Sequence, residues 1–198
     1  IEEMTYEKLT SSVRSVKEKI SELLSTADTG RIIREGLSVS IVGKPNVGKS
    51  SLMNVLMGEN RAIVTDIPGT TRDIIEESMV IKNIPVVITD TAGIRDTEDI
   101  IEKIGIEKSK TALSRADLII FVIDASRPLE EEDMRIMSHV AGRRAIVLLN
   151  KSDKGLAADR ALIEKELPSA VIIETSVTGG RGIEELTQAI EDMVYGGK

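Results

Sequence analysis

The sequence predicts an α/β fold in which helices cover both faces of a mostly parallel sheet. From residue 37 onward, strand-like and helix-like stretches alternate, and this order is typical of parallel strands joined by helices. Several strand-like stretches are continuous apolar runs, such as residues 118–123, and runs of this kind suit strands buried on both faces. We therefore expect a three-layer fold with ligands bound beyond the carboxyl ends of the strands.

Six strands are expected, and one of them is reversed. Asn83 joins two strand-like stretches so tightly that they should form an antiparallel hairpin. The expected strands are residues 37–42, 74–82, 84–89, 117–123, 145–149 and 170–174, and the expected helices are residues 50–58, 103–115, 129–141, 157–167 and 182–194.

The first 29 residues predict a separate amphipathic helix. Apolar side chains recur there at helical spacing, at Met4, Leu9, Val13, Val16, Ile20, Leu23 and Leu24. Such a helix must bury its apolar stripe on another surface. We expect residues 1–29 to be the last helix of a helical domain that this fragment lacks, residues 30–36 to be a linker, and residues 37–198 to form the α/β domain. The alternative is a helix that lies on the α/β domain itself.

Composition narrows the functional classes. The net charge is −7 and aromatic residues make up 2% of the chain, which argues against strong nucleic-acid binding by this segment alone. Cysteine is absent, so disulfides and thiolate metal sites are excluded. No stretch is apolar over the roughly 18 residues of a membrane span, and no signal peptide is present. A cytoplasmic protein without membrane contact is expected.

Residues 43–50 form a complete phosphate-binding loop, G-x-x-x-x-G-K-S, between an expected strand and an expected helix. Its glycines let backbone N–H groups surround phosphate oxygens, and the helix N-terminus adds positive potential. Lys49 would reach the β- and γ-phosphates, and the Ser50 hydroxyl would hold Mg²⁺. This context predicts the P-loop NTPase fold.

Two further motifs follow strand ends. Asp90 ends the strand 84–89, where its carboxylate can reach Mg²⁺ through water, and the N–H of Gly93 can contact a γ-phosphate. The sequence N-K-S-D at residues 150–153 decides the base. The Asp153 carboxylate can accept two hydrogen bonds from guanine, whereas adenine offers no such donor pair. Asn150 can bridge guanine and the phosphate loop, and the stem of Lys151 can lie over the base.

Two loops complete the expected site. A backbone N–H in residues 175–178, after the last strand, is placed to bind guanine O6, although this short Ser/Thr pattern is equally typical of a plain loop. Residues 61–73 are rich in Thr and are broken by Pro68-Gly69, which suits a mobile switch. Thr71 is the expected Mg²⁺ ligand of this switch, with Thr70 adjacent.

The residue that would orient the attacking water is not evident from spacing. Ile94 stands where Ras-like GTPases carry a glutamine, and it has no donor or acceptor. Four acidic residues follow in a polar stretch, and spacing does not choose among them. They are Asp96, Glu98, Asp99 and Glu102.

Together these motifs resemble the G domain of the MnmE (TrmE) family of tRNA-modification GTPases. The resemblance covers about residues 30–195 and is carried by residues 43–54, 62–73, 90–96, 102–108 and 150–153. It implies a Ras-like G domain that hydrolyses GTP with Mg²⁺, is stimulated by K⁺ and dimerises across its nucleotide face. It also implies a full-length protein that modifies wobble uridines in tRNA together with MnmG (GidA), an FAD-binding partner.

The resemblance also assigns residues. Glu102 matches the family's catalytic glutamate, joined by Lys49 and Gly93 in the catalytic set. Asn46, Thr65, Ile67 and Thr70 match the potassium ligands, while Ser50, Thr71 and Asp90 serve Mg²⁺. The nucleotide-contacting positions are Asn46, Val47, Gly48, Lys49, Ser50, Ser51, Thr65, Asp66, Ile67, Pro68, Gly69, Thr70, Thr71, Asp90, Thr91, Ala92, Gly93, Asn150, Lys151, Ser152, Asp153, Ser176, Val177 and Thr178.

Two residues depart from the family pattern, and two other functions stay open. Val177 stands where alanine is frequent, and Asp96 stands where glutamate is frequent. The first alternative is a ribosome-assembly GTPase of the EngA (Der) kind, which shares several motifs. The second, motivated by Ile94, is a scaffold that binds GTP without hydrolysing it.

Overall fold

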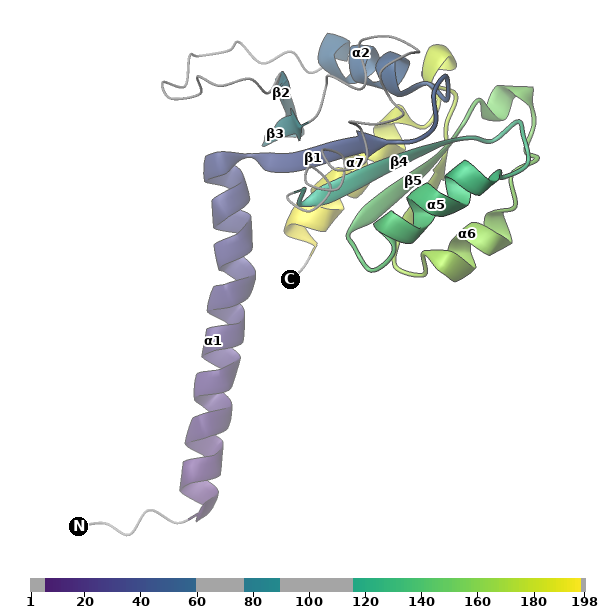
Figure 1. The fold of residues 1–198 in the computed structure, drawn as a ribbon. Coiled ribbons are helices and arrows are strands. Elements are labelled where there is room, and N and C mark those ends of the chain that lie inside the picture. The colour runs from purple at the N-terminus through teal and green to yellow at the C-terminus, as the bar shows by residue number, and fades with distance from the viewer. Residues whose placement is uncertain (1–5, 60–76, 90–115, 197–198) are drawn as a thin grey trace, which may run out of the picture.

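The computed structural model describes residues 6–59, 77–89 and 116–196, which form a six-stranded sheet covered by helices (Figure 1). The strands are β1 (Leu37–Val42), β2 (Glu77–Ile81), β3 (Ile84–Thr89), β4 (Leu118–Asp124), β5 (Ala145–Asn150) and β6 (Val171–Glu174). They lie in the order β2-β3-β1-β4-β5-β6, and only β2 runs antiparallel to its neighbour. The predicted mixed sheet is confirmed.

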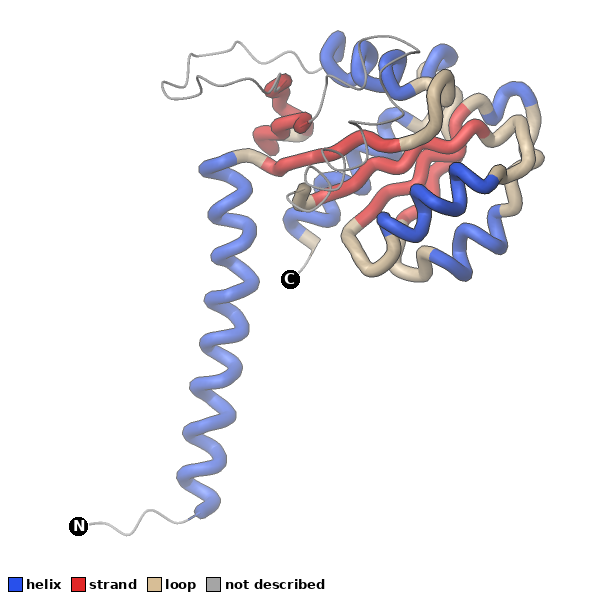
Figure 2. Tube along the Cα trace, in the orientation of Figure 1, coloured by secondary structure: helices blue, strands red, loops and turns tan. Residues whose placement is uncertain are grey.

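Helices cover both faces of this sheet (Figure 2). They are α2 (Lys49–Glu59), α5 (Glu131–Val140), α6 (Arg160–Glu166) and α7 (Ile183–Tyr195), with short 3₁₀ turns η1 (Ser152–Lys154) and η2 (Val177–Gly179). Alternate residues of β4 enter different cores. Ile120 and Val122 pack with α2 and α7, whereas Phe121 and Ile123 pack with α5 and α6. The continuous apolar run of β4 therefore reflects burial on both faces, as the sequence predicted.

The turn between β2 and β3 explains the reversed strand. Lys82 and Asn83 both have positive φ, at 45° and 64°, as a two-residue type I′ turn requires. That turn matches the twist of paired strands, so the hairpin closes without a longer loop. The described part of β2 begins at Glu77, and the expected strand residues 74–76 lie outside the described residues. The expected helix 103–115 also lies outside them.

Helix α1 (Tyr6–Glu35) is longer than the sequence predicted and extends away from the sheet (Figure 1). Residues 30–35, expected to be a linker, continue the helix, which ends only at Gly36 with φ of 90°. The last turn is held by packing, because Ile32 is buried in the core. Among residues 6–59, 77–89 and 116–196, no helix combines the length and the apolar composition of a membrane-spanning segment. The division into domains stays a prediction.

The outer part of α1 exposes three apolar side chains to solvent. Val13, Val16 and Ile20 are 60%, 55% and 51% exposed, so in this region the helix does not lie on the α/β domain. Among the side chains that the structure describes, contacts with that domain come from the last two turns. Thr29 Oγ1 donates to the carbonyl of Val194 at 3.2 Å, and Arg31 pairs with Asp117 at 2.6 Å.

Candidate nucleotide-binding site

The phosphate loop lies between β1 and α2, and two glycines there have no room for a side chain. A Cβ on Gly43 would lie 2.2 Å from the carbonyl oxygen of Val122 in β4. A Cβ on Gly48 would lie 2.3 Å from the side-chain amide nitrogen of Asn150, and its φ is 108°. The loop therefore packs its backbone directly against the ends of β4 and β5, which leaves backbone amides available to line a phosphate site.

Lys49 directs its ammonium back onto this loop. Its Nζ donates to the carbonyls of Gly43 at 2.7 Å and Lys44 at 2.6 Å. Burial lowers the pKa of Lys49 below its usual value, and the negative charge of Glu132 opposes this shift. A partly desolvated cation at the N-terminus of α2 suits the recognition of phosphate oxygens.

Asn150 ties the phosphate loop to the loop after β6. Its side chain is buried, and Nδ2 donates to the carbonyl of Val47 at 2.7 Å. The other end, Oδ1, accepts the backbone N–H of Val177 at 3.1 Å. Three segments far apart in sequence are thus joined by one amide side chain, which fixes the phosphate and base halves of the expected site relative to each other.

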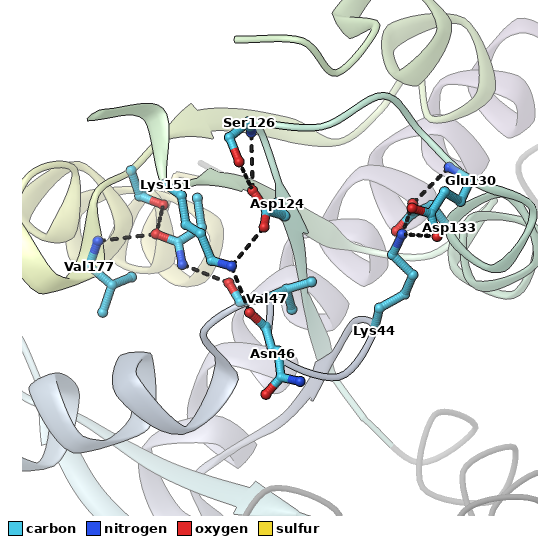
Figure 3. Close-up of polar contacts among 11 residues, drawn as sticks. Lys44, Asn46, Val47, Asp124, Ser126, Glu130, Asp133, Lys151 and Val177 are labelled. Carbon is cyan, nitrogen blue, oxygen red and sulfur yellow. Dashed lines mark hydrogen bonds and ion pairs between the residues drawn. The ribbon is translucent and has the colours of Figure 1, made fainter. Parts of the chain in front are cut away.

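Lys151 makes a second bridge to the phosphate loop (Figure 3). Its Nζ donates to the carbonyl of Asn46 and to Asp124 Oδ2, both at 2.7 Å. The carboxylate of Asp124 also accepts from the N–H of Ser126 at 3.1 Å and from its hydroxyl at 2.6 Å. Burial would raise the pKa of Asp124, but the bonds from Lys151 and Ser126 outweigh it and lower the pKa.

Asp153 is exposed, and Ser176 holds its carboxylate. Ser176 Oγ donates to Asp153 Oδ1 at 2.6 Å, and this bond lowers the pKa of Asp153. An ionised carboxylate in this place can accept hydrogen bonds from guanine. The backbone N–H of Ser176 donates to the carbonyl of Arg181 at 3.1 Å, and that of Val177 is used by Asn150. The expected contact of this loop with guanine O6 stays a prediction.

Some of the remaining expected site residues lie in described elements, and the others lie outside the described residues. Ser50 and Ser51 follow Lys49 in α2, Ser152 begins η1, and Thr178 lies in η2. Within the ranges 6–59, 77–89 and 116–196, no group of three or more His, Asp or Glu side chains is arranged to hold a metal ion. The other candidates lie outside the described residues: Thr65, Asp66, Ile67, Pro68, Gly69, Thr70, Thr71, Asp90, Thr91, Ala92, Gly93 and Glu102.

The sequence interpretation missed two residues that contact the site. Asp124 ends a strand-like apolar run, just as Asp90 does, and the same reasoning would have drawn attention to it. Lys44 occupies a variable position of the phosphate-loop motif, so no sequence signal marks it. Its ammonium pairs with Asp133 at 2.8 Å and Glu130 at 2.9 Å, at the start of α5.

Comparison with known proteins identifies the class of this site. A family model described as 50S ribosome-binding GTPase matches residues 38–151, which span β1 through Lys151. The chain belongs to this GTPase family. Membership confirms the predicted P-loop GTPase fold and the prediction of a GTPase.

Relatives of this GTPase chain extend the similarity over its full length. It is 55% identical over 197 residues to a tRNA modification GTPase MnmE of Clostridioides difficile and 49% identical to one of Thermoanaerobacter sp.. Both matches cover 100% of the chain but 43% of the relative. The resemblance to MnmE is confirmed, and the chain spans less than half of the length of these proteins.

Solved structures of GTPases share the fold. The G domain of the T. maritima FeoB iron transporter is 27% identical, with a TM-score of 0.54, over 79% of this chain and 97% of that domain. The cytosolic domain of the same transporter in its GMPPNP form is 26% identical, with a TM-score of 0.58, over 80% of this chain and 64% of the other.

Proposed function

We propose that this GTPase chain is the catalytic domain of a larger protein that modifies wobble uridines in tRNA. The observation that carries the proposal is 55% identity over the whole chain to a protein named tRNA modification GTPase MnmE. The family description mentions ribosome binding, but that model matches only residues 38–151. Relatives that match α1 and α7 as well carry the tRNA-modification name, and this favours tRNA modification over ribosome assembly.

The geometry of the described residues supports a proposal for how the guanine nucleotide is bound. Lys49 and the backbone amides around Gly48 hold the β- and γ-phosphates. Asp153 accepts the guanine N–H donors, and Asn150 keeps the base loop and the phosphate loop together. The narrow fit of Gly43 and Gly48 against neighbouring strands supports a cradle that only backbone can line.

Hydrolysis requires a water molecule aligned with the γ-phosphate. That water attacks phosphorus, the bond to the β-phosphate oxygen breaks, and GDP and phosphate leave. Ile94 has no polar atom in its side chain, so another group must position this water. In our proposal Glu102 does so indirectly, because it matches the catalytic glutamate in the resemblance to MnmE. Mg²⁺, which Ser50, Thr71 and Asp90 would hold, supplies charge neutralisation of the phosphates when bound.

We also propose that K⁺ stimulates hydrolysis and that two G domains pair across their nucleotide faces. Asn46 is exposed, and its backbone is fixed by Lys151 and has φ of 61°. Figure 3 shows its side chain pointing away from the Lys151 contact. An amide oxygen there, with Thr65, Ile67 and Thr70, is a hard ligand set that suits an alkali cation. A cation beside the phosphates offsets developing negative charge.

The test measures GTP turnover and oligomeric mass in KCl and in NaCl, with GDP and aluminium fluoride as transition-state mimic. We expect faster turnover in KCl, and a dimer only with K⁺ and the mimic. Asn46→Ala should abolish the difference between the two salts while Mg²⁺-dependent GTP binding remains. Equal turnover in both salts would contradict the potassium proposal. GTP binding without any turnover would favour the alternative of a scaffold that binds GTP without hydrolysing it.

The role in tRNA modification needs the full-length protein. We expect it to support wobble-uridine modification of tRNA in the presence of an MnmG-like FAD protein and GTP. The Glu102→Ala protein should bind GTP normally but fail in this assay. Normal modification by a hydrolysis-deficient protein would separate the GTPase activity from the tRNA reaction, and ribosomal-subunit binding without modification would favour the EngA-like alternative.

A further inference from the structure

Lys44 attaches the phosphate loop to the beginning of α5. Its Nζ lies 2.8 Å from Asp133 Oδ2 and 2.9 Å from Glu130 Oε2. The side chain of Lys44 is 13% exposed and that of Asp133 is 2% exposed, so their contact is shielded from water, whereas the Glu130 side chain is 60% exposed. Burial alone would lower the pKa of Lys44, but the bonds to Asp133 and Glu130 outweigh it and raise the pKa. Lys44 is therefore a firmly held cation at neutral pH.

Asp133 is fixed by its place in the helix. Its Oδ2 also accepts the backbone N–H of Glu130 at 2.9 Å, which caps the first turn of α5. The other oxygen, Oδ1, is buried and has no hydrogen-bond partner in the described part of the chain. A buried carboxylate with an unsatisfied oxygen depends strongly on a close cation, and Lys44 provides it. The pair therefore resists separation.

The backbone of Lys44 connects this pair to Lys49. The carbonyl of Lys44 accepts a hydrogen bond from Lys49 Nζ at 2.6 Å, beside the bond from Lys49 to Gly43 at 2.7 Å. Figure 3 shows the Lys44 side chain leaving the loop toward Glu130 and Asp133, on the side away from Lys151. Because the Lys44 side chain is anchored, the orientation of its backbone carbonyl is restrained. This carbonyl can therefore fix the direction in which the Lys49 ammonium points.

We propose that Lys44 and Asp133 are positioning residues for phosphate recognition and that they act through Lys49. The proposal rests on the proposed nucleotide site, in which Lys49 contacts the β- and γ-phosphates. A purely structural role, limited to holding the start of α5, makes a different prediction. Only in a positioning role does the effect of Lys44 on GTP binding depend on the presence of Lys49.

A double-mutant cycle separates these roles. The affinity for GTP with Mg²⁺ is measured by displacement of a fluorescent guanine nucleotide from Lys44→Met, Lys49→Ala and the double variant. We expect Lys44→Met to weaken binding about tenfold in the native background and less than about twofold in the Lys49→Ala background. Equal losses in both backgrounds would overturn the positioning role. Unchanged GTP affinity in Lys49→Ala alone would instead refute the proposed nucleotide site, and this proposal with it.

Three variants guard against effects of folding. Lys44→Arg keeps the charge and should restore most of the affinity. Asp133→Asn keeps an oxygen that can cap α5 but removes the carboxylate charge, so it should weaken GTP binding as Lys44→Met does. If Lys44→Met shows no cooperative thermal transition, Asp133→Asn replaces it in the double-mutant cycle with Lys49→Ala. Lys82→Met, which removes a lysine paired with Glu191 at 3.6 Å, should leave affinity unchanged. A lower Tm of Asp133→Asn with native affinity would overturn the proposal.

Discussion

At the scale of single residues, Asp153 is the residue that we propose selects guanine. Its carboxylate is exposed, ionised and held at one oxygen by Ser176. In Asp153→Asn the amide oxygen still accepts from Ser176, while the amide nitrogen becomes a donor toward the base. We expect affinity for GTP to fall about tenfold or more, and affinity for xanthosine triphosphate to rise, because the amide reverses one hydrogen bond to the base.

Competition between the two nucleotides for the variant measures this change. Asp159→Asn is a matched control, because Asp159 is also exposed but caps α6 by accepting the N–H of Leu162. The control should keep the native preference for GTP. Unchanged GTP affinity in Asp153→Asn would contradict the assignment of the base site.

Asp124 has a residue-scale role that depends on pH. Its pKa in the folded protein lies below the value of about 3.9 of an unfolded chain, so its ion pair stabilises the fold above that pH. The contribution is lost as pH falls through the lower folded-state pKa. We expect Asp124→Asn to be about 1–2 kcal/mol less stable at pH 7. We also expect it to lose less stability than the native protein between pH 5 and pH 2.

Urea unfolding of both proteins at pH 7, 5, 3 and 2 checks the prediction for Asp124. If the difference in unfolding free energy between the two proteins is the same at all four pH values, the pKa of the Asp124 carboxylate does not change on folding. GDP affinity, measured in parallel, should fall several-fold in Asp124→Asn, because Lys151 loses the partner that holds it beside Asn46.

At the scale of elements, the turn from β1 into α2 depends on close backbone packing. Gly48→Ala would place a methyl group 2.3 Å from the Asn150 amide at a φ of 108°. We expect this variant to lose nucleotide binding and to unfold at a lower temperature, because the loop must move away from β5.

Gly58→Ala, inside α2 itself, provides the comparison for this loop variant. Apart from its chain neighbours and its own helix backbone, no atom of the described residues lies within 4 Å of a Cβ at Gly58. Alanine should therefore raise stability by about 0.5–1 kcal/mol through its better helix propensity. Thermal unfolding and GDP binding of both variants are compared. Native GDP affinity in Gly48→Ala would show that the loop tolerates a side chain and would refute the close-packing argument.

At the scale of the whole molecule, α1 is attached only near its C-terminal end in the described residues. Arg31 pairs with Asp117, which also accepts the backbone N–H of Ser38 at 3.0 Å. We expect deletion of residues 1–20 to leave the Tm unchanged, because the described side chains there are exposed. Arg31→Ala should lower the Tm by a few degrees, since a partly buried carboxylate loses its partner.

Arg34→Ala is the control for this attachment. Arg34 lies on the same helix turn but pairs with its neighbour Glu35 on the surface. Such exposed pairs contribute little, so its Tm should stay within one or two degrees of the native value. An equal fall of Tm in both arginine variants would mean that the helix itself, and not the Asp117 contact, had been weakened.

The sequence predicted the parts of the molecule whose chemistry is local. Backbone geometry requires glycine at residues 43 and 48 and a tight turn at Asn83. Long apolar runs predict the buried strands. Contacts between distant segments were not predictable. Asp124 and Lys151 are 27 positions apart in the sequence. Lys44 contacts Asp133 only because the fold places the start of α5 beside the phosphate loop. The length of α1 was missed for the same reason, because Ile32 is buried by tertiary packing.

The attachment of α1 has a mechanical consequence. The helix has 30 residues and is therefore about 45 Å long, and it joins β1 at the end opposite to the phosphate loop. A tilt of about 5° at its root would swing the far tip by about 4 Å, given the rise of 1.5 Å per residue. Asp117, at that root, comes directly before β4, so any small shift of this strand would be magnified along the helix as by a lever arm.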